Sequence, residues 1–274
     1  SARHYSTDEA LYTNFTKATG IKINRLEGGE DQLLQRIKSE GANSPADVFL
    51  TVDAGRLWLA DQEGVFAPVQ SKVLNERIPA AYRLASNTWY GLSSRARVMV
   101  VDKLKVKPGE ITSYEDLADP KWKGQVCTRS GSHVYMLSLI SSIIEHAGAE
   151  KAEAWAKGVV ANLARPPKGG DTDQVKAVAA GECAVALSNS YYLARMIKSD
   201  KADDRTAMER VRVVWPNTNG RGVHMNVSGG GVLKYAPNRD NAIKFMEYLV
   251  SDEAQGYFAN GNNEWPAVPS VKVD

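Results

Sequence analysis

Residues 183–195 read CAVALSNSYYLAR, and this stretch changes character halfway along. The first part, from Cys183 to Leu187, is a short apolar run typical of a buried strand. The second part begins a helix at two adjacent tyrosines, Tyr191 and Tyr192. In open α/β sheets, ligands bind at the carboxyl ends of strands, where helices begin. The tyrosine pair therefore lies where a ligand site is expected in an α/β fold.

Two more tyrosines, Tyr5 and Tyr135, occupy the same kind of position along the chain. An ionised phenol is an oxygen donor that suits a trivalent metal ion. Four phenols at strand-to-helix turns therefore indicate a site for a hard cation. A single tyrosine at a helix start is more often a half-buried packing residue, and the remaining tyrosines are interpreted in that way.

Composition places the chain among ordinary globular proteins. It has 274 residues, which is enough for one large domain or two lobes, and 43% of them are hydrophobic. The net charge of +2 and the lack of a long basic run give no case for a nucleic-acid partner. No stretch of about 18 apolar residues predicts a membrane span.

Strand and helix patterns alternate in the first part of the chain. Helices are predicted from about residue 8 to Gly20, around 33–37 up to Gly41, and over 56–62, with strands at 21–23 and 47–52. This order predicts a largely parallel sheet that is covered on both faces.

The middle of the chain differs, because 89–92 and 97–101 read as two strands with no long helix between them. Further strands are expected at 124–128, 183–187, 211–216 and 223–234, and further helices at 134–146, 149–163, 171–180, after Tyr191 and at 241–250. These patterns suggest two lobes joined by crossing strands, one made of 1–100 with 221–274 and the other of 101–220. A ligand would then lie between the lobes.

The two cysteines, Cys127 and Cys183, both lie in short apolar runs. They are either buried thiols of the core or partners in a disulfide between neighbouring strands. Sequence alone cannot place their Cα atoms within bridging distance, so both alternatives stay open. A metal site built from two cysteines alone would be incomplete.

Five motifs link the chain to a known family. They are SARHY at 1–5, SPADV at 44–48, LADPKWKG at 117–124, SNSYYLAR at 188–195 and NVSGGGV at 226–232. Through them the chain resembles the bacterial periplasmic ferric-iron-binding proteins, the soluble receptors of ABC iron importers, in their cyanobacterial-type branch. The resemblance covers nearly the whole chain. The tyrosine pair is its specific part, whereas DPKWKG marks the fold more than the ligand.

The resemblance implies a bilobed periplasmic-binding-protein fold of type II, with Fe(III) in the cleft between two α/β lobes. The ligands it implies are Tyr5 from the first lobe and Tyr135, Tyr191 and Tyr192 from the second. His4 matches a histidine that in related proteins can join the coordination sphere, and the alternative is that it only hydrogen-bonds beside the metal. The resemblance also places Arg95 and Arg195 near the metal. The family also has a strand before the His-Tyr motif and a helical segment after Trp265, so both ends of this chain are expected to be trimmed.

The proposed metal site would have an excess of negative charge. A free tyrosine has a pKa of about 10, and four phenolates around one Fe(III) leave a net charge of about −1. A buried site with this excess requires a cation nearby, and Arg95 and Arg195 are the candidates. Arg195 follows Tyr191 and Tyr192 by four and three residues, so it shares a helix face with them.

Several neighbouring residues have simpler interpretations. Arg95 and Arg97 alternate on a strand pattern, and we expect them to point to opposite faces, with only Arg95 toward the ligand. Asp171 and Asp173 are interpreted as helix-capping residues. The other three histidines are expected to be surface or structural residues: His133, His146 and His224. The glycines 229–231 do not form a phosphate loop, because no Lys-Ser/Thr follows at the required spacing.

We expect a receptor, not an enzyme, that captures Fe(III) and delivers it to an ABC permease in the membrane. We expect it to act as a monomer in the periplasm, with membrane association left open. A receptor of the same fold for an anion or a small organic cation is the alternative. An enzyme that uses a tyrosine together with His4 is a further alternative, but no nucleophile motif supports it. Binding of Fe(II), and a water or anion as an additional ligand, also stay open.

Overall fold

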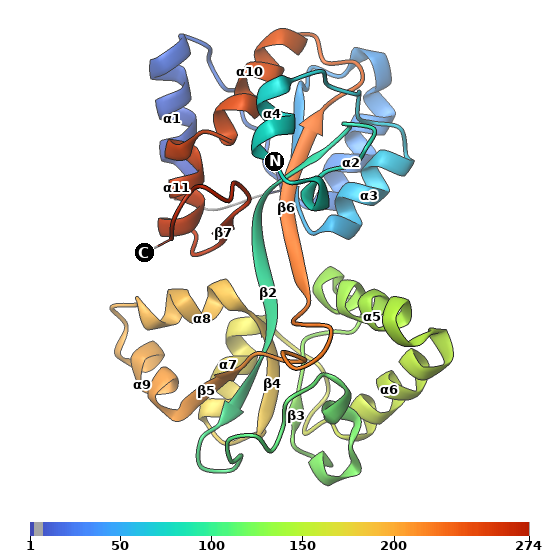
Figure 1. The fold of residues 1–274 in the computed structure, drawn as a ribbon, viewed down its shortest axis with the longest axis vertical. Helices are drawn as coiled ribbons and strands as arrows, with labels where there is room; N and C mark the ends of the chain where they lie inside the picture. Colours follow the sequence, from blue (N-terminus) through green and yellow to red (C-terminus); the bar gives the residue numbers. More distant parts are fainter. Residues whose placement is uncertain (3–7, 274) are drawn as a thin grey trace. The chain divides into compact units, whose positions relative to one another are not determined.

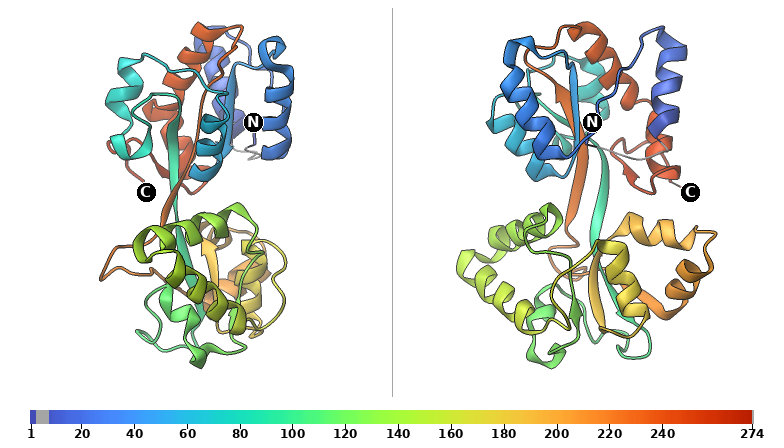
Figure 2. Two further views of the ribbon diagram at one scale, coloured as in Figure 1. Left: turned by 90° about the vertical axis from the view of Figure 1, so that its right-hand side faces the viewer. Right: turned by 180° about the vertical axis from the view of Figure 1, so that it is seen from behind.

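A computed structural model of the chain describes residues 1–2 and 8–273. The chain divides into two compact units, one formed by Ser1–Ser94 with Asn226–Asp274 and the other by Arg95–Met225. In each unit, helices flank the strands on two sides (Figures 1 and 2). A compact unit need not fold on its own, so the division into domains at 100/101 and 220/221 stays a prediction.

The first unit contains helices from both ends of the chain. Its helices are α1 (Asp8–Thr19), α2 (Glu30–Glu40), α3 (Ala54–Gln62), α4 (Lys72–Arg77), α10 (Arg239–Leu249) and α11 (Asp252–Asn260). Gly20, with φ of 73°, lies directly after α1, and Ser71 caps α4 by accepting a hydrogen bond from the Leu74 amide. The ring of Phe15 on α1 packs edge-on against Phe245 on α10, with centroids 5.2 Å apart. This contact joins segments that are far apart in the sequence.

The strands of the first unit are β1 (Val48–Val52), most of β6 (Met225–Val232), β7 (Trp265–Pro266) and the beginning of β2 (Tyr90–Asp102). β1 pairs antiparallel with β6, from Val48 opposite Val232 to Val52 opposite Ser228. The glycines of β6 lie close to neighbouring backbone. A Cβ atom on Gly229 would lie 2.1 Å from the Tyr90 carbonyl oxygen, and one on Gly230 would lie 2.4 Å from that of Phe49. Glycine is therefore required here by packing.

The second unit contains α5 (Val134–Ala147), α6 (Ala149–Ala161), α7 (Asp171–Ala179), α8 (Ser190–Ile197) and α9 (Ala202–Arg210). Its strands are the remainder of β2, β3 (Val126–Cys127), β4 (Val185–Asn189) and β5 (Val211–Val214). β2 lies between β4 and β5 and pairs antiparallel with both, and β3 runs parallel to β4. In Figure 1, α5 and α6 lie on one side of these strands and α7, α8 and α9 on the other.

Three predictions about the strands are wrong. Among the strand pairs of the described residues, only β3 with β4 is parallel, because the long strands β2 and β6 run opposite to their neighbours. Residues 21–23 form no strand, and Ile21 and Ile23 instead pack against the hydrophobic core of the first unit. The two strands expected at 89–92 and 97–101 are one strand of 13 residues, and the residues between them, 93–96, are buried like the rest of this strand.

The two cysteines form a disulfide, with Cα atoms 5.9 Å apart. Cys127 ends β3, and Cys183 lies two residues before β4, the strand that runs parallel to β3. Both cysteines are fully buried. The open alternative between core thiols and a disulfide is therefore resolved in favour of the disulfide between neighbouring strands.

Candidate metal-binding site

Three of the predicted tyrosines lie together in the second unit. Tyr135 is in the first turn of α5 and Tyr191 is in the first turn of α8. Their hydroxyl oxygens are 3.0 Å apart, within hydrogen-bonding distance, and both side chains are buried. The ring of Tyr192 lies against that of Tyr191, with centroids 4.3 Å apart and planes tilted by 33°. The sequence places Tyr135 far from this pair, and the fold brings the three together.

The helix starts fix the positions of these tyrosines. His133 is the N-cap residue of α5, and its ring nitrogen Nδ1 accepts a hydrogen bond of 3.2 Å from the Tyr135 amide. The His133 ring also lies edge-on to the Tyr135 ring, at 4.6 Å between centroids. At the start of α8, the Ser190 hydroxyl accepts a hydrogen bond of 3.1 Å from the Ala96 amide on β2. Both helices direct a partial positive charge toward their first turns, which favours anionic ligands there.

Four arginines lie close to the tyrosine rings. The guanidinium carbons of Arg95, Arg97 and Arg129 are 5.6, 5.8 and 5.0 Å from the centre of the Tyr135 ring. That of Arg195 is 5.5 Å from the Tyr191 ring and 5.8 Å from the Tyr192 ring. These distances are in the range of cation–π contacts. Arg195 thus lies beside both tyrosines of its helix.

The expectation that Arg95 and Arg97 point to opposite faces is wrong. Side chains alternate along a strand, so residues i and i+2 share a face. Both arginines are buried and both reach the Tyr135 ring. Arg129, which follows β3 by two residues, approaches the same ring and was not singled out from the sequence. The position of Arg129 just after a strand is the sequence feature that could have indicated a place near the ligand site.

The two aspartates of α7 have different roles. Asp173 accepts a hydrogen bond of 2.7 Å from the Gly170 amide, so it caps the helix as predicted. Asp171 does not cap the helix. Its fully buried carboxylate lies 2.5 Å from Nη1 of Arg97 and 3.3 Å from Nη1 of Arg129. No sequence pattern indicates this ion pair, because the partners come from separate segments.

Another tyrosine, Tyr114, is bonded to the backbone of Arg97 and has a structural role. Its hydroxyl donates to the Arg97 carbonyl oxygen and accepts a hydrogen bond of 3.0 Å from the His224 amide. Burial raises the pKa of Tyr114 to about 12. Burial, followed by the charges of Arg97 and Arg95, lowers the pKa of the His224 ring to about 4. Both groups are therefore neutral at pH 7.

The remaining predicted ligands, His4 and Tyr5, lie outside the described residues. Within the described part of the chain, no group of three or more His, Cys, Asp or Glu side chains is arranged to hold a metal ion. None of the described helices is long and apolar enough to cross a membrane.

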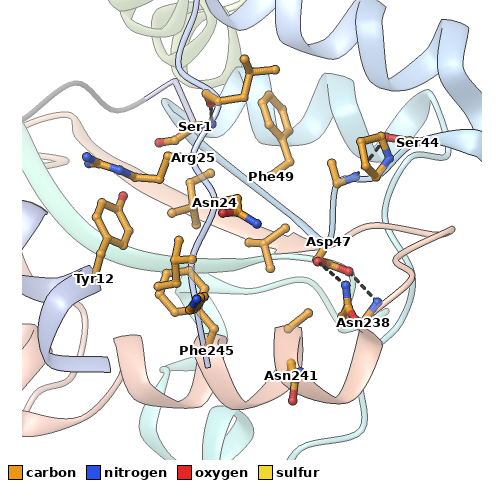
Figure 3. Close-up of a pocket in the computed structure, with 18 of the residues that line it drawn as sticks. Ser1, Tyr12, Asn24, Arg25, Ser44, Asp47, Phe49, Asn238, Asn241 and Phe245 are labelled. Atoms are coloured by element: carbon orange, nitrogen blue, oxygen red, sulfur yellow. Dashed lines mark hydrogen bonds between the residues drawn. The ribbon is translucent and has the colours of Figure 1, made fainter. Parts of the chain in front are cut away.

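One pocket lies in the first unit and contains none of the predicted site residues (Figure 3). Its volume is about 730 Å³, and Phe49 and Phe245 are among the residues that line it. At its edge, the Asp47 carboxylate accepts hydrogen bonds of 2.7 and 3.2 Å from the backbone and side-chain nitrogens of Asn238. Arg25 and Arg36, which also line the pocket, pair with Glu9 and Glu40. We give the pocket no part in the metal site.

Known proteins are similar to this chain over its whole length. A family model described as "Bacterial extracellular solute-binding protein" matches residues 43–274. The Iron uptake protein A1 of Synechocystis sp. is 51% identical over 274 residues, which are 100% of this chain and 76% of the relative. The Major ferric iron-binding protein of Neisseria meningitidis is 30% identical over 277 residues, covering 99% of this chain and 80% of the relative.

Solved structures are also similar to this chain. The Trichodesmium protein IdiA or FutA, solved in complex with iron and citrate ligands, has a TM-score of 0.95 and 56% identity over 100% of this chain and 86% of its own. The ferric binding protein of Campylobacter jejuni has a TM-score of 0.95 and 39% identity over 100% of this chain and 87% of its own. The fold is that of the bilobed α/β periplasmic binding proteins. The chain belongs to the bacterial extracellular solute-binding protein family and, within it, to the ferric-iron-binding proteins.

Proposed function

We propose that this protein is a receptor that captures Fe(III) through tyrosinate ligands and delivers it to an ABC-type iron importer. The observation that carries the proposal is the 3.0 Å distance between the hydroxyl oxygens of Tyr135 and Tyr191, with Tyr192 beside them. Phenolate oxygens are hard donors that suit a trivalent ion. The names of the relatives, an iron uptake protein and a ferric iron-binding protein, support the same ligand.

The proposed ligands are Tyr135, Tyr191 and Tyr192, together with Tyr5 and His4. A trivalent cation strongly favours the ionised form of each phenol, so iron binding releases protons. Four phenolates around one Fe(III) leave a net charge of about −1. The proposed balance comes from Arg95 and Arg195. Arg97 and Arg129 also lie near the Tyr135 ring, and because they share the Asp171 carboxylate, the three groups together add one net positive charge.

We place the mature protein in the periplasm, as a monomer without enzymatic activity that passes iron to a membrane permease. A relative from Serratia marcescens named "Fe(3+)-binding periplasmic protein", 28% identical over 96% of this chain, supports the compartment. The disulfide between Cys127 and Cys183 supports it too, because disulfides persist in oxidising compartments. Size-exclusion chromatography with and without iron tests the monomer.

A receptor of the same fold for a non-metal ligand is the second candidate. The arginines near the tyrosine rings favour it, because guanidinium groups bind anions. A more distant relative, 27% identical over 90% of this chain, is named a thiamine-binding protein. This candidate needs no tyrosine pair, so Tyr192→Phe would leave its ligand binding unchanged.

Titration of the metal-free protein with ferric iron, held soluble by a weak chelator, tests the proposal. Tyrosinate ligands produce a visible phenolate-to-iron charge-transfer band, and Tyr191→Phe is expected to weaken both the band and the affinity. A protein that binds no iron, or that binds it without such a band, would overturn the proposal.

A further inference from the structure

The Asp171 carboxylate connects three segments of the second unit. Its Oδ2 accepts from Nη1 of Arg97 on β2 at 2.5 Å and from the Asn189 amide at the end of β4 at 2.8 Å. Its Oδ1 accepts from Nη1 of Arg129, after β3, at 3.3 Å. A fully buried carboxylate with two cationic partners and one amide donor is well compensated. Its contacts therefore fix where these groups lie.

Two of its partners lie against one tyrosine. Arg97 and Arg129 have their guanidinium carbons 5.8 and 5.0 Å from the centre of the Tyr135 ring. Arg97 is almost fully buried, and its Nη1 reaches both Asp171 and, at 3.0 Å, the amide oxygen of Asn189. Without the carboxylate, the buried guanidinium group of Arg97 and the partly buried one of Arg129 would keep their charge and lose their anionic partner. Both would then move or take up water beside the Tyr135 ring.

The third partner of Asp171, Asn189, lies close to the other two tyrosines in the sequence. Asn189 directly precedes α8, the helix that carries Tyr191 and Tyr192 in its first turn. Both the backbone nitrogen and the side-chain oxygen of Asn189 bond to the Asp171–Arg97 pair. The position of the α8 start, and with it the 3.0 Å distance between the Tyr135 and Tyr191 oxygens, is thus tied to the same carboxylate.

We propose that Asp171 is a positioning residue of the metal site. It touches no metal. It holds Arg97 and Arg129 beside Tyr135 and holds the start of α8, so that the phenol oxygens of Tyr135 and Tyr191 are at ligand distance before iron arrives. This inference rests on the proposed function, because it assigns the two tyrosines as ligands. Outer partners of this kind orient ligands and tune their donor strength.

The test compares Asp171→Asn with Asp173→Asn, which removes a charge from the same helix turn but from a capping group. Asp171→Asn is expected to bind ferric iron about tenfold more weakly or worse, in competition with a chelator. Its phenolate-to-iron band is expected to be displaced, because the charges beside Tyr135 change. In the metal-free protein, the Asn189 amide is expected to exchange its hydrogen faster. Asp173→Asn is expected to change none of these three properties.

A folded Asp171→Asn variant with the affinity and the band of the unchanged protein would overturn the inference. If this variant does not fold, Asn189→Ala replaces it, since this change removes the side-chain amide whose oxygen accepts from Arg97 beside the carboxylate and leaves the backbone bond to Asp171 in place. A displaced band then supports the inference and an unchanged band overturns it. Tyr191→Phe separates the two claims: if that variant also binds iron normally, the proposed function fails, and not only the role of Asp171.

Discussion

The hydroxyl oxygens of Tyr135 and Tyr191 lie 3.0 Å apart, although 56 residues separate the two tyrosines in the sequence. Two neutral phenols share a hydrogen bond at this distance. Two phenolates would repel each other there unless a cation lay close to both. The same pair therefore suits both states: a hydrogen bond joins the tyrosines without metal, and under the proposed function both become ligands when iron displaces their protons.

Removing one phenol oxygen tests the role of this pair. Tyr191→Phe keeps the ring and is expected to weaken ferric-iron binding by at least about 100-fold, because a direct ligand matters more than its outer partners. The free energy of unfolding of the metal-free protein is expected to fall by only about 1 kcal/mol, for one lost hydrogen bond. Chelator competition and chemical denaturation give the two values. The control is Tyr235→Phe, at a tyrosine that is 50% exposed in the first unit, and equal iron affinities of the two variants would contradict the assignment.

Removing the disulfide tests the stability of the second unit. Cys127 and Cys183 are 56 residues apart in the sequence, so the bridge closes a loop that would be open in the unfolded chain. Replacing both cysteines by alanine is expected to lower the free energy of unfolding by about 4 kcal/mol. Denaturant titration measures this difference. Because neither cysteine lies in the first turn of α5 or α8, the folded variant is expected to keep its iron affinity.

Two glycine substitutions test the close packing of β6. Gly230→Ala places a Cβ atom 2.4 Å from the Phe49 carbonyl oxygen, which is part of the β1 backbone and cannot move away cheaply. The expected loss of stability is on the order of 3 kcal/mol. Gly256→Ala is the matched control, because Gly256 lies inside α11 and, apart from the adjacent residues and the backbone of its own helix, no atom lies within 4 Å of the added methyl group. This change is expected to stabilise the protein by about 0.5–1 kcal/mol. Thermal unfolding of both variants gives the comparison, and equal effects would contradict it.

The buried ring of His224 is expected to make stability depend on pH. Its pKa is about 4 in the folded protein and 6.5 when unperturbed, so the unfolded chain takes up the proton first as the pH falls. The contribution of the neutral His224 ring to the free energy of unfolding is complete above pH 6.5 and is lost as the pH falls from 6.5 to about 4. This contribution is at most about 3 kcal/mol. Denaturant titrations across this range are expected to show a smaller decline for His224→Gln than for the unchanged protein. Parallel declines would contradict the prediction.

Hydrophobic spacing predicted most of the helices, because the apolar positions of an amphipathic helix recur within a short stretch of sequence. The helix over 134–146 agrees with α5 to within a residue, and α1 begins at Asp8 and ends before Gly20 as predicted. The short helices α4 and α9 and the second C-terminal helix α11 were not predicted, since few apolar positions mark them. Strand pairing was less predictable. Whether two strands run parallel depends on which partners the fold brings together.

The candidate site was predictable in part for the same reason. The tyrosines at helix starts are visible in the sequence, and so is the spacing of Arg195 from Tyr191. The ion pair of Asp171 with Arg97 is not visible, because its partners are 74 residues apart and come from different elements. A carboxylate in the first turn of a helix is usually explained by helix capping alone. Only its burial identifies the different role of Asp171.

The absorption spectrum of the purified protein during titration with ferric iron tests the central claim most directly. We expect a visible phenolate-to-iron band that saturates at one iron per chain, is reduced in Tyr135→Phe and Tyr191→Phe, and is unchanged in Tyr235→Phe. Tight iron binding with no such band, or a band that persists unchanged in both of the first two variants, would contradict ligation by these tyrosines.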